Sequence, residues 1–349
     1  MLKNVIHNKL LPVLLLFAVL PVLLLGGYGY FSLSSTLREH NVAQQENRVT
    51  LTGERMDVFL QGVHSDLFYL RDSSAMSLYL SALKLGDENS QALMLKNLQT
   101  SLLDFSDKKG IYHQIRFIDK AGKELVSIER STDASRIVED GKLQNRKGSF
   151  YFDDAIGLAK DGLFVSSLDL NQEKGKVELP IRPAIRYATP VFAENNELKG
   201  LVILNVSAAN LLKLISGQDN ANESMMFIDK GGFYYYHPDE NKAWGGKNDL
   251  NSGSNFYKDY PELINGIENN ISLASFEAGG HFISVQPVMV GNGHQKLGTL
   301  VSMSNARSVY AKSNYFALVA LGLLALTIVL AVVFAKRLSN TVSSVSSKE

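Results

Sequence analysis

Two long stretches without a charged side chain constrain this chain more than any other feature. They run from Leu10 to Phe31 and from Tyr315 to Ala335. Each is long enough to cross a bilayer as a helix, which needs roughly 20 residues. Because the hydrocarbon core offers no partner for backbone polar groups, only helices and closed barrels span it. We therefore expect membrane helices at residues 10–33 and 313–335.

The first stretch could instead be a cleaved signal peptide, since Lys3 and Lys9 precede it. Its apolar length, however, exceeds the usual hydrophobic region of about 7–15 residues. The segment Gly26–Tyr30 at its end also lacks a cleavage site of small residues. These features favour an uncleaved anchor.

Basic residues flank both stretches on the same side. Lys3 and Lys9 precede the first, and Lys336 and Arg337 follow the second. Since positive residues tend to stay in the cytoplasm, both chain ends are expected there. Residues 34–312 then form an extracytoplasmic domain.

The composition narrows the partners and the source of stability. The chain has 35 Lys and Arg against 35 Asp and Glu, so its formal net charge is zero and no nucleic acid is indicated as a partner. It has no cysteine, so no disulfide can support the outer domain. That domain must be stabilised by its own core.

The outer domain begins with a helical pattern. Apolar residues recur at three- and four-residue steps between Ser34 and Arg71. They are Met56, Phe59, Leu60, Val63, Leu67 and Leu70. A second helix is predicted over Ser90–Phe105. Residues 34–109 are therefore expected to form a long stalk helix and a second helix.

Strand patterns follow from about residue 110. Apolar and polar residues alternate from Ile111 to Phe117, and a turn leads into the apolar segment Leu125–Ile128. Further strands are predicted at Leu163–Leu168, Ile185–Val191 and Leu201–Val206. The outer domain is therefore expected to mix helices with antiparallel strands.

A short repeat divides this region. Phe117–Gly122, with the sequence Phe-Ile-Asp-Lys-Ala-Gly, recurs at Phe227–Gly232 as Phe-Ile-Asp-Lys-Gly-Gly. Each copy is followed downstream by an apolar strand that a glycine introduces, at Gly200 and at Gly298. The pattern predicts two α+β units of similar plan in tandem.

The order of these segments resembles the double Cache family, the tandem PAS-like extracytoplasmic sensors of bacterial histidine kinases, chemoreceptors and diguanylate cyclases. The resemblance is strongest at Leu163–Asn171, Ile185–Phe192 and Phe227–Asp239. It implies an α+β fold, in which a long N-terminal helix and two tandem PAS-like antiparallel-sheet modules are flanked by two transmembrane helices. None of the matching segments is a catalytic signature.

The resemblance also implies a division of the chain. It places a cytoplasmic N-terminus at 1–9, a membrane-distal module at 110–216, a membrane-proximal module at 217–312, and the start of a HAMP-like linker at 336–349. This linker is too short for an output domain, so we expect a truncated receptor of the bacterial inner membrane. Ala331 and Ala335 are spaced for close helix contact in a homodimer.

The family's amino-acid sensors carry an Arg, an aromatic pair, a further Tyr and a closing Asp that holds the ligand's amino group. Arg146, Phe150 and Tyr151 fall in the matching region, but three residues separate the Arg from the pair where the family motif has one. Asn205 replaces the closing Asp. Because asparagine lacks the charge that favours an ammonium group, the sequence argues against an amino-acid ligand.

Two arginines, Arg182 and Arg186, lie at the entry to a predicted strand and are candidates to bind an anionic ligand. Side chains alternate along a strand, so Arg186 and Tyr187 face opposite sides. If the Arg186 face lines the distal pocket, its guanidinium suits a carboxylate. The alternative is a structural ion pair with Asp169, Asp153 or Asp154. The candidate ligand-binding residues are Arg146, Tyr151, Asp169, Arg182, Arg186, Tyr187 and Asn205.

No feature predicts catalysis, a cofactor or a metal. The S-x-x-K match at Ser81–Lys84 lacks its companion motifs, and no histidine pair has metal-ligand spacing. We therefore expect a sensor that binds a small molecule, with a carboxylate as the candidate ligand, in the membrane-distal module. The alternative is a scaffold whose outer domain binds a periplasmic binding protein or another protein. A membrane-anchored enzyme is the least supported class.

Overall fold

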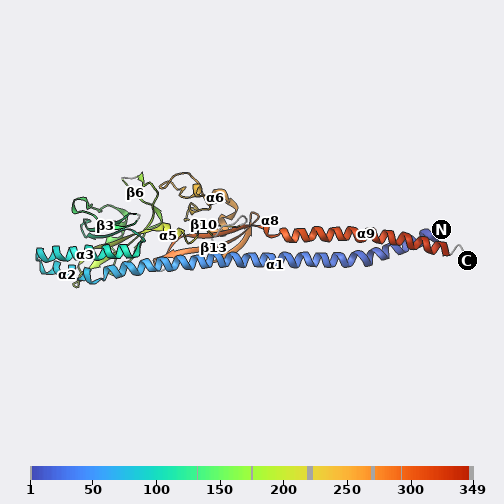
Figure 1. Cartoon of the computed structure of the whole chain (residues 1–349), viewed down its shortest axis with the longest axis horizontal. Coiled ribbons are helices and arrows are strands. Elements are labelled where there is room, and N and C mark those ends of the chain that lie inside the picture. Colours follow the sequence, from blue (N-terminus) through green and yellow to red (C-terminus); the bar gives the residue numbers. More distant parts are fainter. Residues whose placement is uncertain are drawn as a thin grey trace. The chain divides into compact units, whose positions relative to one another are not determined.

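The computed structural model of the chain describes residues 2–131, 133–173, 176–217, 223–268, 272–291 and 293–345. Its elements are drawn in Figure 1. The helices are α1 (Leu2–Arg71), α2 (Ser74–Leu85), α3 (Glu88–Lys109), α4 (Phe150–Ile156), α5 (Ala208–Leu212), α6 (Phe256–Asp259), α7 (Ile264–Glu268), α8 (Ala306–Val309) and α9 (Ala311–Val345), with short 3-10 helices at Asp140–Lys142, Glu240–Lys242 and Pro261–Leu263.

The strands fall into two main sheets and a small hairpin. They are β1 (Tyr112–Asp119), β2 (Glu124–Arg130), β3 (Ser135–Ile137), β4 (Phe164–Val165), β5 (Asp169–Leu170), β6 (Gln172–Glu173), β7 (Lys176–Val177), β8 (Pro183–Phe192), β9 (Leu198–Ser207), β10 (Glu223–Ile228), β11 (Tyr234–Tyr236), β12 (Ala274–Ala278), β13 (His281–Val290) and β14 (Gln295–Asn305).

The chain separates into two compact units. The larger unit contains residues 46–279 and 284–303. The other contains α1 up to Gln45, residues 280–283, and the chain from Ser304 onward. The predicted fold class is confirmed, since a long N-terminal helix, two antiparallel sheets and long apolar helices near both ends are all present.

In the larger unit, α1 presents the predicted apolar stripe to a core. Five of its members are buried, namely Met56, Leu60, Val63, Leu67 and Leu70. They belong to the same cluster as buried side chains of α2, α3 and the first sheet. The stripe is therefore what attaches α1 to this sheet.

Capping residues define α2 and α3. Ser73 and Asp87 each accept a hydrogen bond from a backbone N–H in the first turn that follows. Gly86 and Gly110 end the two helices in the left-handed conformation that favours glycine. The helix predicted at 90–105 is present, and it is longer than predicted, because α3 runs from Glu88 to Lys109.

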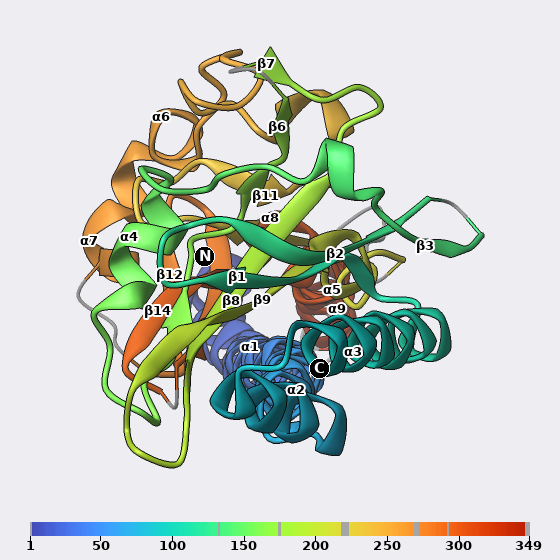
Figure 2. The ribbon, with the colours of Figure 1, turned by 90° about the vertical axis from the view of Figure 1, so that its left-hand side faces the viewer.

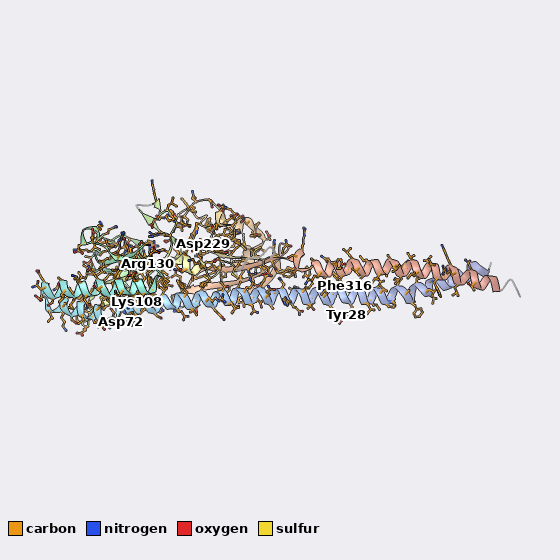
Figure 3. The ribbon with its side chains drawn as sticks, in the orientation of Figure 1. Tyr28, Asp72, Lys108, Arg130, Asp229 and Phe316 are labelled. Atoms are coloured by element: carbon orange, nitrogen blue, oxygen red, sulfur yellow. The ribbon has the colours of Figure 1, made fainter. Side chains whose placement is uncertain are left out.

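The first sheet has seven strands in the order β3-β2-β1-β9-β8-β4, and β5 also pairs with β8. Its central pairs are antiparallel. One face packs on the core shared with α1, α2 and α3, and the other packs on α4 (Figure 2). At the end of β2, Arg130 donates to Asp107 of α3 at 3.0 Å; Figure 3 labels Arg130 and Lys108, the residue after Asp107.

The second sheet repeats the plan of the first, as the sequence repeat predicts. Its order is β11-β10-β14-β13-β12, which matches β2-β1-β9-β8 strand for strand over its first four members. In both copies an aspartate closes the hairpin turn. Asp119 Oδ1 accepts from the N–H groups of Ala121 and Lys123, and Asp229 Oδ1 accepts from that of Phe233.

The glycines that introduce the last strand of each copy have the same role. A Cβ at Gly200 would collide with the carbonyl oxygen of Ile118 on the neighbouring strand. A Cβ at Gly298 would lie 2.6 Å from the carbonyl oxygen of Ile228, the equivalent residue of the second copy. Each glycine therefore permits a close backbone approach in its sheet.

The strand predicted at Leu163–Leu168 is wrong in extent, because only β4 lies within it and the short strand β5 follows it at Asp169–Leu170. Between them, the backbone N–H of Arg186 donates to Ser166 Oγ at 2.9 Å. A side-chain oxygen thus takes the place of a backbone carbonyl, which interrupts the ladder.

The second unit holds the apolar helices. Within the described residues, α1 and α9 are long and apolar enough to cross a membrane. A Cβ at Gly29 would lie 2.6 Å from the Phe316 ring, so the glycine lets this ring lie against the α1 backbone; Figure 3 labels Phe316 and the neighbouring Tyr28. Ala331 and Ala335 are buried within the single chain, so their small size already serves packing without a second copy.

A buried polar group in the same unit joins α1 to the end of β14. Gln45 Nε2 donates to Asn41 Oδ1 at 2.7 Å and to Ser304 Oγ at 2.6 Å. Ser304 Oγ in turn donates to Asn41 Oδ1 at 2.9 Å. Because these partners satisfy one another away from water, they fix one register between helix and strand.

Candidate functional site

The face of the first sheet under α4 gathers polar side chains from three strands. In the ladder, Gln114 of β1 lies opposite Asn205 of β9, and Asn205 lies opposite Arg186 of β8. In the next row, Arg116 lies opposite Ile203. Since paired residues project to the same face, two arginines from separate strands reach one side of the sheet.

Glu124 holds two of the arginines. Its side chain is 2% exposed, and its Oε1 accepts from Arg146 Nε at 2.7 Å. Arg116 Nε lies 3.2 Å from the same oxygen. The other oxygen of Glu124 accepts from the backbone N–H of Gln144 at 2.9 Å. Arg116 also reaches the hydroxyl of Tyr151 on α4, at 3.5 Å from Nη1.

Arg186 has its own carboxylate partner. Its Nη1 lies 2.8 Å from both oxygens of Asp169, so the structure contains the first of the ion pairs considered from the sequence. Its Nη2 lies 3.4 Å from Asn171 Oδ1. The guanidinium carbon lies 5.6 Å from the centre of the Phe150 ring, which is within cation–π range.

We call Arg116, Arg146, Arg186, Glu124 and Asp169 the arginine cluster. Its three guanidinium groups and two carboxylates leave one unbalanced positive charge. Burial, reinforced by the positive charges of Arg146 and Arg186, lowers the pKa of Arg116 to about 10. Burial raises the pKa of Asp169, while Arg186 acts in the opposite direction. Desolvation is therefore a dominant influence on both groups.

Asn205 lies in the same row as Arg186 and is 5% exposed. Its Nδ2 lies 3.5 Å from Gln114 Oε1. Its Oδ1 is buried and has no hydrogen-bond partner among the described residues. A buried acceptor without a partner costs free energy, so this oxygen would gain from a donor at the arginine cluster.

Two of the predicted site residues lie elsewhere. Tyr187 faces the opposite side of β8 from Arg186, where it is buried in the core shared with α1. Arg182 precedes β8 and pairs with Glu178 at 3.4 Å. Arg146, Tyr151, Asp169 and Asn205 therefore gather around Arg186, whereas Tyr187 and Arg182 do not.

Glu124 was missed by sequence reasoning. Alternation along β2 would place it with Val126 and Ile128, which are buried in the apolar core. A bulge in the β1–β2 pairing between Phe117 and Ile118 shifts the register and brings Glu124 opposite Ile118. Such a bulge reverses the side to which the following residues point.

The described part of the chain assembles no metal site of the common kind, since no group of three or more histidine, aspartate or glutamate side chains lies close enough to hold an ion. The charged groups at the arginine cluster instead pair with one another.

Comparison with protein families identifies the outer domain. Residues 63–297 match the model of the bacterial histidine kinase sensor domain. The chain belongs to this family. The match covers α1 from Val63, the first sheet, the second sheet up to the start of β14, and the whole arginine cluster, so the cluster lies within a sensor domain of a bacterial receptor. A comparison with curated protein sequences found no match.

Solved structures share the fold at low sequence identity. One is the extracellular domain of vpHK1S-Z8, assigned as a histidine kinase, with 20% identity, a TM-score of 0.66, and coverage of 80% of this chain and 96% of that one. Another is a domain of a protein from Vibrio parahaemolyticus assigned to the sensory box/GGDEF family, with 20% identity, a TM-score of 0.65, and coverage of 78% and 98%.

A third is the sensory domain of the Campylobacter jejuni chemoreceptor Tlp3, with isoleucine bound. It has 14% identity, a TM-score of 0.55, and coverage of 79% of this chain and 97% of that one. The sensor domain therefore has the fold expected from its resemblance to tandem PAS-like sensors.

Proposed function

We propose that this sensor domain is extracytoplasmic and binds a small carboxylate at the arginine cluster. The observation that carries the proposal is the unbalanced positive charge of three buried or half-buried guanidinium groups beside two carboxylates. A monocarboxylate would neutralise that charge, and guanidinium groups bind carboxylates with favourable geometry. Asn205 would donate to the same carboxylate from its amide Nδ2.

The chemoreceptor with isoleucine bound gives a related ligand class, but one feature here favours a simpler carboxylate. Both carboxylates of the arginine cluster are already paired with arginines. Asn205 adds an amide without charge. A ligand ammonium group would therefore have to compete with Arg186 for Asp169, whereas a ligand carboxylate would not.

Binding would act on signalling rather than on chemistry. We propose that the carboxylate favours one arrangement of the first sheet and that this change passes along the chain to α9. A ligand shifts such an equilibrium only by its difference in affinity for the two states. The domain would then bind its ligand without transforming it, and a homodimer would carry the signal across the membrane.

The test is thermal denaturation of the full chain in detergent micelles with propionate, succinate or L-isoleucine. Propionate is expected to raise the Tm most, because it brings one negative charge and no ammonium group. A ligand at 100 times its Kd stabilises the folded state by about 2.7 kcal/mol. Arg186→Lys keeps the charge but loses the planar guanidinium, so it should reduce the shift.

Arg182→Lys is the matched control, since it makes the same change at an arginine outside the cluster. The proposal fails if no carboxylate raises the Tm, or if both variants lose the shift equally. Capture of a periplasmic binding protein by a chain that responds to no carboxylate would instead support the scaffold function.

A further inference from the structure

A cavity lies on the opposite side of β8 from the arginine cluster. Its volume is about 490 Å³, within the range of small-molecule sites. Tyr187 of β8 lines it together with Asp57, Gln61 and His64 of α1 and Met289 of β13. The cavity is thus shared by the first sheet, the long helix and the second sheet, all within the larger unit.

Two donor groups on α1 are used within the helix. Gln61 Nε2 donates to Asp57 Oδ2 at 2.7 Å. The hydroxyl of Ser65, which also lines the cavity, donates to the backbone carbonyl of Gln61 at 3.0 Å. The second oxygen of Asp57 and the amide oxygen of Gln61 remain as acceptors. The α1 wall of the cavity is therefore richer in acceptors than in donors.

The remaining lining suits the same kind of ligand. Burial lowers the pKa of His64, which favours the neutral imidazole, with one acceptor nitrogen and one donor nitrogen. The lining described here contains Asp57 but no lysine or arginine. Leu60, Met289 and Val290 supply apolar surface.

Tyr187 adds an aromatic side chain and a polar group in the wall. It is 1% exposed, and its hydroxyl has no hydrogen-bond partner among the described residues. An aromatic wall beside a carboxylate is a favourable setting for an organic cation. It is a poor setting for an anion.

We propose that this cavity binds a small organic ammonium ion, with Asp57 as its counter-ion. The ammonium group donates to the carboxylate of Asp57 and to neighbouring acceptors, and the carbon chain of the ligand packs on the apolar part of the lining. This site is independent of the carboxylate site, because Arg186 and Tyr187 face opposite sides of β8.

The test is isothermal titration calorimetry of the full chain in detergent micelles with n-butylammonium. Saturable binding of n-butylammonium is expected. Asp57→Asn keeps the shape and an acceptor for Gln61 but removes the charge. It should weaken binding by about tenfold or more, as expected for loss of a charge-assisted hydrogen bond.

Asp104→Asn is the matched control, because Asp104 is an exposed helical carboxylate on α3 outside this cavity. It should bind n-butylammonium as the unchanged chain does. The proposal is overturned if n-butylammonium does not bind, or if Asp57→Asn binds it with unchanged affinity. If n-butylammonium does not bind while propionate still raises the Tm, the ammonium site is excluded and the proposed carboxylate site is not.

Discussion

Gly200 sits where the first sheet leaves no room for a side chain, since a Cβ there would collide with the carbonyl oxygen of Ile118. We expect Gly200→Ala to destabilise the domain by about 1–3 kcal/mol, as overpacking in a well-packed site does. Gly157→Ala is the control, because a Cβ at Gly157 meets nothing within 4 Å and its φ is −88°. Thermal denaturation measures the Tm of both variants. If Gly200→Ala kept a Tm as close to that of the unchanged chain as Gly157→Ala does, this account would be wrong.

His113 should make the domain less stable in acid. Burial lowers the pKa of its imidazole, and Arg182 adds to this effect while Glu178 opposes it. The unfolded chain then binds a proton near pH 6.5 that the folded chain resists, so stability is lost as the pH falls below that value. His113→Gln should lose less Tm than the unchanged chain between pH 7 and pH 5. An equal loss would show that His113 does not contribute.

Alternation along β8 was enough to predict that Arg186 and Tyr187 face opposite sides. It could not predict the carboxylate partners of the arginine cluster. Glu124 reaches Arg116 only because of a bulge in the β1–β2 pairing, and no local sequence pattern indicates where that bulge lies. Asp169 was one of several acidic residues available to Arg186, and the choice depends on how β5 meets β8.

At the scale of elements, the stripe on α1 should dominate the attachment of this helix to the first sheet. Leu67 is fully buried in the shared core, whereas Val58 on the same helix is 72% exposed. We expect Leu67→Ala to cost about 2–5 kcal/mol, through lost burial and the cavity left behind. Val58→Ala should change stability by no more than about 0.5 kcal/mol, as exposed substitutions do.

Urea denaturation of the full chain in detergent would measure both changes. Similar midpoints for Leu67→Ala and Val58→Ala would mean that α1 is not held through its stripe. The periodicity that predicted this helix is a local property of the sequence, which explains why it was reliable. The extent of β4 and β5 depends instead on a hydrogen bond from Arg186 to Ser166, which lie far apart in the sequence.

For the whole molecule, the two apolar helices decide where the sensor domain lies. The chain has no cysteine, so one introduced cysteine is its only thiol. Leu85 at the end of α2 is 78% exposed, and Arg337 on α9 is exposed beyond the apolar stretch. If residues 34–312 are extracytoplasmic, a membrane-impermeant maleimide should label Leu85→Cys in intact spheroplasts. It should label Arg337→Cys only after detergent opens the membrane, because positive residues favour the cytoplasmic side. Labelling of both cysteines in intact spheroplasts, or of Arg337→Cys alone, would exclude an extracytoplasmic domain with cytoplasmic chain ends.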